Sequence, residues 1–369
     1  MRLTKNNNTC LQKEVELDRT FVNGLCNWIF KIRFLSYTYY LYPFTAYYFL
    51  MSYFSLRALT KSYDSHAALQ EFSLELAKGE FVSIIGESGS GKSTLLRIAA
   101  GLLTQSSGEV VLDGKKIENP AEKLVPGYDE IKLIHQDYQL FPNTTVEENI
   151  TRPLLNYEEK YRKQRVAHLL DRLGLTPYKD RLPRQLSGGQ QQKVAIAQAM
   201  AVEPEVLLLD EPFSHLDAIQ KRKLIYELKE LLREMDTTVI FVTHDLDDAL
   251  WLTDSLVVLQ KGKVTQKGNS KALCEQPKSK YVARLFSSIN ALPDREQAYI
   301  RPADIRIRTR GGLVGHVVEQ RYLVHYNSLL IRLKEGGQFW EVDDPARKYQ
   351  IGDRVYLHIQ EEKVLELKS

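Results

Sequence analysis

A glycine-rich loop with one lysine and four hydroxyl side chains follows a short apolar run in FVSIIGESGSGKST, residues 81–94. Glycines at 86, 89 and 91 let the backbone wrap around an anion with its N–H groups pointing inward. The Lys92 ammonium can reach the β- and γ-phosphates of a nucleotide, and the Ser93 hydroxyl can ligate Mg²⁺. The predicted phosphate-binding residues are Gly86, Glu87, Ser88, Gly89, Ser90, Gly91, Lys92, Ser93 and Thr94.

Two adjacent carboxylates follow a second apolar run, PEVLLLDEP at residues 204–212. The four aliphatic residues 206–209 predict a buried strand that ends at Asp210. This is a Walker B pattern, in which Asp210 holds Mg²⁺. Because the chain turns where a strand ends, Glu211 can face the γ-phosphate beside Asp210. We therefore predict that Glu211 is the base that polarises an attacking water.

A second candidate anion-binding feature stands alone in the sequence. Residues 184–200 read RQLSGGQQQKVAIAQAM, in which a Gly–Gly pair precedes a run that predicts a helix. A helix N-terminus with uncovered N–H groups is a natural anion site. No other phosphate-binding element lies near it in the sequence, so the residues alone leave open which anion it binds and where that anion comes from.

Between about residues 51 and 290, the order and spacing of these motifs resemble the ATP-binding subunit of ABC transporters. LSGGQ at 186–190 is similar to the family's signature motif, and SHLD at 214–217 to its D-loop. Gln136, in LIHQDYQLFPNTTVEENI, occupies the Q-loop position. His244, in IFVTHD, occupies the H-loop position, and Tyr63 stands where the family stacks adenine.

The resemblance implies an ATPase that uses ATP and Mg²⁺. It implies that His244 contacts the γ-phosphate or holds Glu211 and the water in place. It also implies that Gln136 links the nucleotide state to a partner protein. The catalytic residues would be Lys92, Glu211 and His244. The Mg²⁺ ligands would be Ser93, Gln136 and Asp210.

The signature motif then implies a dimer. By resemblance it faces outward and binds the γ-phosphate of ATP held at Lys92 of a second copy, in a head-to-tail arrangement. The residues involved would be Ser187, Gly188, Gly189 and Gln190. Plain structural roles stay open for Tyr63, Gln136 and His244, and Asp217 also suits the N-cap of the next helix.

The surrounding elements predict an α/β fold of the P-loop NTPase type. Apolar runs near 54–59, 71–76, 81–85, 131–134, 206–209, 239–242 and 255–260 alternate with helices. This predicts one mixed sheet, largely parallel, with helices on both faces. A mostly helical insert is expected at about 137–190. A helix at about 217–235 carries leucines at helical spacing and should pack on the sheet.

After about residue 290 the sequence alternates apolar and polar residues between turns at GG, EGG and IGD. This predicts a small antiparallel barrel at 291–369. The segments IRP at 300–302 and IGDRVYL at 351–357 resemble the OB-like TOBE domain of importer ATPases. The predicted ABC domain is therefore 51–290, followed by a TOBE-like domain.

The first 50 residues differ from the rest and carry the entire net charge of +3. Their run FLSYTYYLYPFTAYYFL at 34–50 is uncharged, but it is rich in tyrosine and interrupted by Pro43. We interpret residues 1–50 as an extension from an upstream start assignment, disordered or not native. A membrane-associated segment and a structured domain are the alternatives.

Deleting residues 1–50 is expected to leave the ATPase activity unchanged, because every predicted motif lies after residue 50. The rate of phosphate release per subunit checks this. Loss of folding or of membrane association on deletion would contradict our interpretation.

Taken together, these features predict the ATPase subunit of an importer at the cytoplasmic face of the cell membrane. Its partners would be permease subunits and, indirectly, a solute-binding protein. The balanced charge after residue 50 disfavours nucleic acid. An exporter subunit is the alternative, and a soluble ATPase acting on nucleic acid or ribosomes is a weaker one. The family division suggests polyamine, iron(III), sulfate or molybdate, thiamine or sugar as solute, and the sequence does not distinguish among them.

Overall fold

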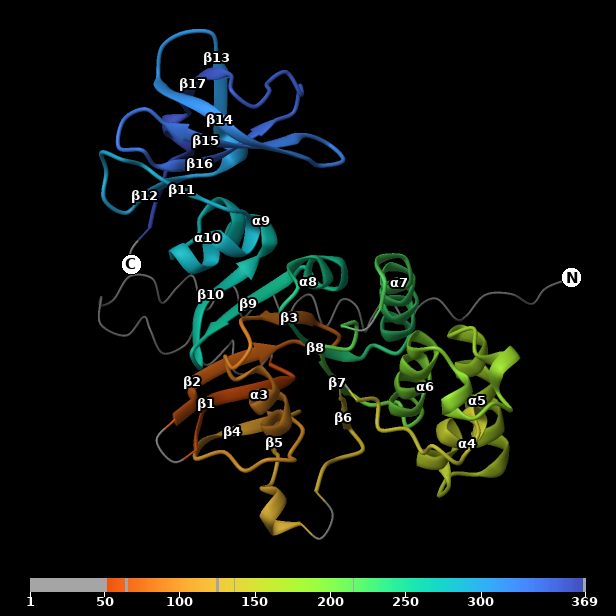
Figure 1. Ribbon diagram of the computed structural model, residues 1–369. Helices are drawn as coiled ribbons and strands as arrows, with labels where there is room; N and C mark the ends of the chain where they lie inside the picture. Colours follow the sequence, from red (N-terminus) through yellow and green to blue (C-terminus); the bar gives the residue numbers. More distant parts are fainter. Residues whose placement is uncertain (1–51, 64–65, 124–125, 136, 215, 368–369) are drawn as a thin grey trace, which may run out of the picture. The chain divides into compact units, whose positions relative to one another are not determined.

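The computed structural model describes residues 52–63, 66–123, 126–135, 137–214 and 216–367 (Figure 1). Two expectations lie outside these residues, namely the N-terminal extension over 1–50 and the Q-loop residue Gln136.

A six-stranded sheet carries the phosphate loop and the carboxylate pair. Its strand order is β10-β9-β3-β8-β7-β6, and all neighbours are parallel except β9 and β10. The strands are β3 (Phe81–Ile85), β6 (Ile131–Ile134), β7 (Val206–Asp210), β8 (Thr238–Thr243), β9 (Ser255–Gln260) and β10 (Lys263–Asn269). Because parallel strands end at the same sheet edge, β3, β7 and β8 deliver the predicted site residues to one place.

The first two predicted strands belong to a separate sheet, which corrects the expectation of a single mixed sheet. This antiparallel sheet has the order β2-β1-β4-β5. Its strands are β1 (Phe54–Tyr63), β2 (His66–Leu76), β4 (Ser107–Leu112) and β5 (Lys115–Lys116). The sequence did not predict β4, β5 or β10. Edge strands such as β5 and β10 face solvent and keep polar side chains, so their apolar signal is weak.

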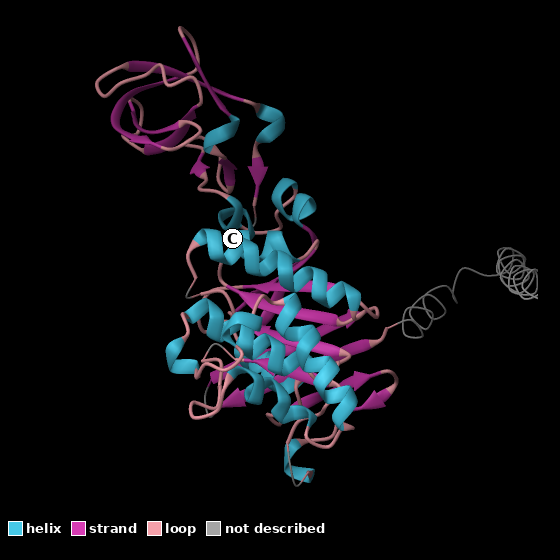
Figure 2. Cartoon of the chain, turned by 90° about the vertical axis from the view of Figure 1, so that its right-hand side faces the viewer, coloured by secondary structure: helices cyan, strands magenta, loops and turns pink. Residues whose placement is uncertain are grey.

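Alternate residues of the parallel strands face two different cores, as the period of two requires. In β7, Val206 and Leu208 face one core, whereas Leu207 and Leu209 face the other. The first core lies between the two sheets and is completed by helix α3 (Lys92–Ala99). Helices thus cover both faces of the parallel sheet, as predicted (Figure 2).

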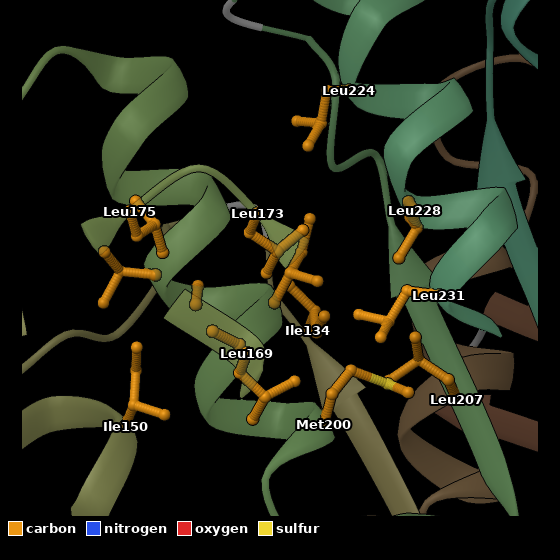
Figure 3. Close-up of a cluster of buried hydrophobic side chains, with 14 of the residues drawn as sticks. Ile134, Ile150, Leu169, Leu173, Leu175, Met200, Leu207, Leu224, Leu228 and Leu231 are labelled. Carbon is orange, nitrogen blue, oxygen red and sulfur yellow. The ribbon is translucent and has the colours of Figure 1, made fainter. Parts of the chain in front are cut away.

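Two long helices cover the second face. They are α6 (Gly188–Met200) and α7 (Ala218–Glu234). Figure 3 shows Leu228 and Leu231 of α7 and Met200 of α6 gathered around Leu207. The predicted apolar stripe of the 217–235 helix is therefore confirmed as the packing face.

The helical insert adds α4 (Val146–Thr151) and α5 (Glu159–Arg172) to the same core. Thr145 caps α4, since its hydroxyl accepts the Glu148 N–H and its own N–H bonds the Glu148 carboxylate. Ile150 of α4 and Leu169 of α5 point into the core beside Leu173 and Leu175 (Figure 3). The insert thus presents the start of α6, where the signature motif lies.

Asp217 caps α7, as its sequence position allowed. Its Oδ1 accepts the N–H groups of Ile219 and Gln220, both at 3.0 Å. Asp217→Ala is expected to lower the free energy of unfolding by about 1 kcal/mol, because two donors of the first turn lose their partner. Urea unfolding checks this, with Asp217→Asn as the control that retains an acceptor. Equal stability of the alanine and asparagine variants would contradict the capping role.

Three short helices and a β domain complete the described part of the chain. The helices are α8 (Leu246–Leu252), α9 (Ser270–Glu275) and α10 (Lys280–Phe286), of which α9 and α10 precede the β domain. The β domain has two antiparallel sheets, β11-β12-β18 and β13-β17-β14-β15-β16. Their strands are β11 (Asn290–Ala291), β12 (Ala298–Ile300), β13 (Ile305–Arg308), β14 (Leu313–Tyr322), β15 (Asn327–Leu333), β16 (Phe339–Asp344), β17 (Arg354–Ile359) and β18 (Leu365–Glu366).

The two sheets of the β domain share one core around Trp340, Leu329 and Ile331. The all-β architecture predicted after residue 290 is confirmed, and its strands form two antiparallel sheets. In the described part of the chain, no helix combines the length and the apolar character needed to cross a bilayer.

Candidate nucleotide site

The phosphate loop connects β3 to α3 and lies tightly against its neighbours. A Cβ at Gly86 would lie 2.3 Å from the carbonyl oxygen of Leu259, and one at Gly91 would lie 2.3 Å from that of Ala68. Gly91 also has a φ of 104°, which disfavours any other residue. Only glycine fits at these two positions, because the neighbouring backbone lies so close. The loop can therefore surround an anion with its backbone N–H groups.

Lys92 lies inside this loop and is only 5% exposed. Its ammonium donates to the carbonyl oxygens of Gly86 at 2.7 Å and Glu87 at 2.9 Å. Burial lowers the pKa of Lys92, and the carboxylates of Glu211 and Asp210 act against that shift. The ammonium is thus buried at the centre of the loop, where an anionic ligand would stabilise its charge.

Ser93 and Asp210 meet at the carboxyl ends of the strands. The Ser93 hydroxyl donates to Asp210 Oδ1 at 3.2 Å. Burial raises the pKa of Asp210, whereas the hydrogen bond from Ser93 lowers it. A hydroxyl and a carboxylate this close can both ligate one Mg²⁺, as the sequence predicted for this pair.

Glu211 turns back toward the loop because its backbone is left-handed, with a φ of 46°. Its N–H donates to the carbonyl of Val242 at 3.0 Å, which pins the turn to β8. One carboxylate oxygen lies 2.8 Å from Nδ1 of His244, and the other lies 4.0 Å from Nζ of Lys92. The structure therefore brings together the three residues predicted to be catalytic.

This arrangement fits a nucleotide with Mg²⁺. Burial disfavours the charged forms of both Lys92 and Asp210, so a phosphate beside the first and a cation beside the second would supply the missing counter-charges. The buried hydroxyl of Ser90 in the same loop has no hydrogen-bond partner in the described part of the chain. An unpaired buried donor in a loop of this kind indicates a place for a ligand oxygen.

Tyr63 ends β1 and is 47% exposed. Its hairpin borders the phosphate loop, because the carbonyl of Ala68 on β2 lies against Gly91. A hollow of about 380 Å³ lies beside the loop, lined by Ala67, Gln70, Glu87, Ser88, Gly89, Ser90, Gln260 and Lys261. The exposed ring of Tyr63 can stack on a base, and the Lys61 ammonium lies over it, 5.2 Å from the ring centroid.

The signature residues lie apart from this cluster. Ser187 caps α6 in a capping box with Gln190, and a Cβ at Gly188 would meet no atom within 4 Å. Within the described residues, no hydrogen bond or ion pair joins Ser187, Gly188, Gly189 or Gln190 to the phosphate loop. Ser187 and Gly188 are exposed at the start of the helix, whereas a Cβ at Gly189 would lie 3.1 Å from side-chain atoms of Gln220 and Leu216.

An ion cluster that was not predicted from the sequence involves two carboxylates that follow His244 in the chain. The Lys221 ammonium of α7 lies 3.1 Å from the Asp245 carboxylate and 2.9 Å from that of Asp248, which is 4% exposed. The cluster ties α7, which follows the D-loop, to the segment that follows His244. The acidic run THDLDD was a visible signal, but nothing in the sequence indicated that Lys221 is its partner.

Comparison with known proteins identifies the family. The family model of ABC transporters matches residues 69–214, and that of the TOBE domain matches residues 298–367. The spermidine/putrescine import ATP-binding protein PotA of Aggregatibacter actinomycetemcomitans is 35% identical over 347 residues, covering 81% of this chain and 92% of the relative. This chain is an ABC transporter ATP-binding subunit. It is of the importer type with a C-terminal TOBE domain, and it hydrolyses ATP.

Two further similarities agree with this family. The PotA protein of Haemophilus influenzae is also 35% identical, with the same coverage of 81% and 92%. A solved dimer of the ATP-binding cassette MJ0796, in a post-hydrolysis state bound to ADP and Pi, is 34% identical with a TM-score of 0.53. The match covers 58% of this ABC subunit and 98% of that cassette. The predicted cassette fold is thereby confirmed.

Proposed function

We propose that this ABC subunit energises the import of polyamines. The supporting observation is its 35% identity, over most of both chains, to relatives named for spermidine and putrescine import. The solute never contacts this subunit, so the geometry of the cassette does not determine which solute is transported. The proposal therefore rests on the similarity along the whole chain, including the TOBE domain.

For hydrolysis, we assign each group near the loop one role. The Glu211 carboxylate accepts a proton from the attacking water, and His244 holds that carboxylate through its 2.8 Å contact. Lys92 binds the phosphates. The water oxygen bonds to the γ-phosphorus, and the bond to the oxygen bridging the β- and γ-phosphates breaks. Adenine would stack on Tyr63.

Mg²⁺, when bound, neutralises charge on the β- and γ-phosphates. Ser93 and Asp210 would hold it, together with Gln136. Chelation with EDTA is expected to stop ATP turnover and added Mg²⁺ to restore it. Phosphate release that continues at the original rate in excess EDTA would contradict this assignment.

We further propose that two copies pair head to tail, so that the α6 start of each faces the phosphate loop of the other. The similar cassette MJ0796 was solved as a dimer bound to ADP and Pi. The open N-terminus of α6 supports this, since its N–H groups would approach the γ-phosphate as an oxyanion clamp.

Permease subunits, fed by a solute-binding protein, would hold the ABC subunit at the cytoplasmic membrane face. Phe141 of the insert is 37% exposed and supports a docking role. However, Arg152 stacks 3.8 Å from its ring, so part of this surface is already covered. Docking on the insert would place the permease next to the Q-loop segment that precedes it.

Uptake by cells tests the solute. Deleting the gene is expected to abolish the uptake of radiolabelled spermidine or putrescine, and the intact gene should restore it where a Lys92→Ala variant does not. Uptake of iron(III) and sulfate serves as the control. Loss of one of these in place of polyamine uptake would overturn the solute assignment, and loss of efflux would favour an exporter.

A further inference from the structure

One side chain from outside the nucleotide motifs bonds to the phosphate loop. The backbone N–H of Glu87 donates to the hydroxyl of Tyr281 at 3.0 Å. Tyr281 lies in the first turn of α10, 194 residues further along the chain. Glu87 is the second residue of the loop and follows directly on β3 through Gly86.

The ring of Tyr281 packs on an apolar cluster that includes Ile85 at the end of β3, Ala249 of α8 and Val258 of β9. A phenylalanine would fill the same space. Burial raises the pKa of Tyr281, so its hydroxyl stays neutral near pH 7. The hydroxyl therefore adds one feature that packing does not need, a hydrogen-bond acceptor aimed at the loop.

The remaining contacts of the loop show why this bond matters. The carbonyl of Ser90 accepts the N–H of Gly262, and the carbonyl of Glu87 accepts both the Ser90 N–H and the Lys92 ammonium. The carbonyl of Gly86, which belongs to the same peptide as the Glu87 N–H, accepts from the Lys92 ammonium. An ammonium that turns toward a phosphate shares fewer of its three donors with these carbonyls. The peptide N–H of Glu87 would then depend on Tyr281 to keep its orientation.

We propose that Tyr281 is a positioning residue for nucleotide binding. Its hydroxyl holds the first turn of the phosphate loop in the conformation that accepts phosphate, so the loop does not have to be reordered when the nucleotide arrives. Tyr281 touches no reacting group, and its effect lies in affinity. The inference rests on the proposed role of the loop in binding phosphate.

The test is Tyr281→Phe in the full chain, which removes the hydroxyl and leaves the ring. The KM for ATP and the Kd for ADP from calorimetry are both expected to rise about three- to tenfold, the size of one net hydrogen bond, while kcat changes less than about twofold. Tyr161→Phe is the matched control. The Tyr161 hydroxyl lies on α5 of the helical insert and donates to the Glu203 carboxylate at 3.0 Å. This control should leave KM and Kd unchanged.

Equal KM and Kd values in the two variants would overturn the positioning role, because Tyr281 would then act only in packing. A fall in kcat with an unchanged KM would overturn it as well. A wild-type chain that fails to bind ADP would instead overturn the proposed role of the loop itself, so the two failures are distinguishable.

Discussion

Replacing Glu211 by glutamine is expected to slow ATP turnover about 10³-fold while ATP still binds, since a lost general base typically costs between about 10² and 10⁴. Glutamine preserves the size of the side chain and an oxygen that can face His244. Its neutral amide, however, does not accept the proton of the attacking water. The phosphate loop and the Mg²⁺ ligands are left in place, so ATP-dependent dimerisation should survive.

Two measurements check this expectation. Phosphate release gives the turnover rate, and light scattering with and without ATP gives the dimer fraction. Glu234→Gln is the control, because that carboxylate pairs with Arg172 on the surface, where an ion pair contributes little. A Glu211→Gln variant that hydrolyses ATP at a rate near wild type would show that another group is the base.

Mixing two inactive variants is expected to restore activity if each site is shared between two copies. Lys92→Ala removes the phosphate-binding ammonium. Gly188→Asp places a negative charge at the start of α6, where it would repel a partner's γ-phosphate. The aspartate should not harm folding, because a Cβ at Gly188 meets no atom within 4 Å and a helix N-terminus favours an acidic residue.

In a one-to-one mixture, about half of the dimers contain one copy of each variant. Each mixed dimer combines the intact loop of one chain with the intact signature of the other, so about a quarter of all sites are complete. Phosphate release should therefore recover to about a quarter of the wild-type rate. A mixture as inactive as its components would place both motifs of a site in one chain.

Two further measurements distinguish the effect of charge at position 188 from that of side-chain size, and test whether hydrolysis requires a dimer. Gly188→Asn has nearly the same shape as the aspartate variant without its charge, and it should retain more activity. Dilution of the wild-type chain should lower the rate per subunit as dimers dissociate. A constant rate down to concentrations at which the protein is monomeric would contradict a shared site.

The nucleotide motifs could be predicted because each is short and chemically demanding. At positions 86 and 91 a Cβ would strike the carbonyl of Leu259 or Ala68, so only glycine fits there. The close contact can therefore be recognised in the sequence from the glycine. The strand before Asp210 was equally clear, since a strand buried on both faces is apolar throughout. The two-sheet division was not predictable, because an apolar run does not state which strand it pairs with.

Gln136 remains a prediction, as it lies outside the described residues. The roles of Tyr63 and of the signature residues also remain predictions. The structure gives their positions, and the experiments above test what they do.

The phosphate loop and the carboxylate pair could be predicted from residue types and spacing, and the order of the motifs carried the resemblance that implied ATPase chemistry. Tertiary structure alone showed the left-handed turn at Glu211, paired Lys221 with Asp248, and brought Tyr281 to the loop. The physical reason is the distance along the chain between the residues that interact. A loop that cradles phosphate is specified by neighbouring residues, whereas a hydrogen bond between residues 194 apart leaves no periodic trace in the sequence and exists only once the chain has folded.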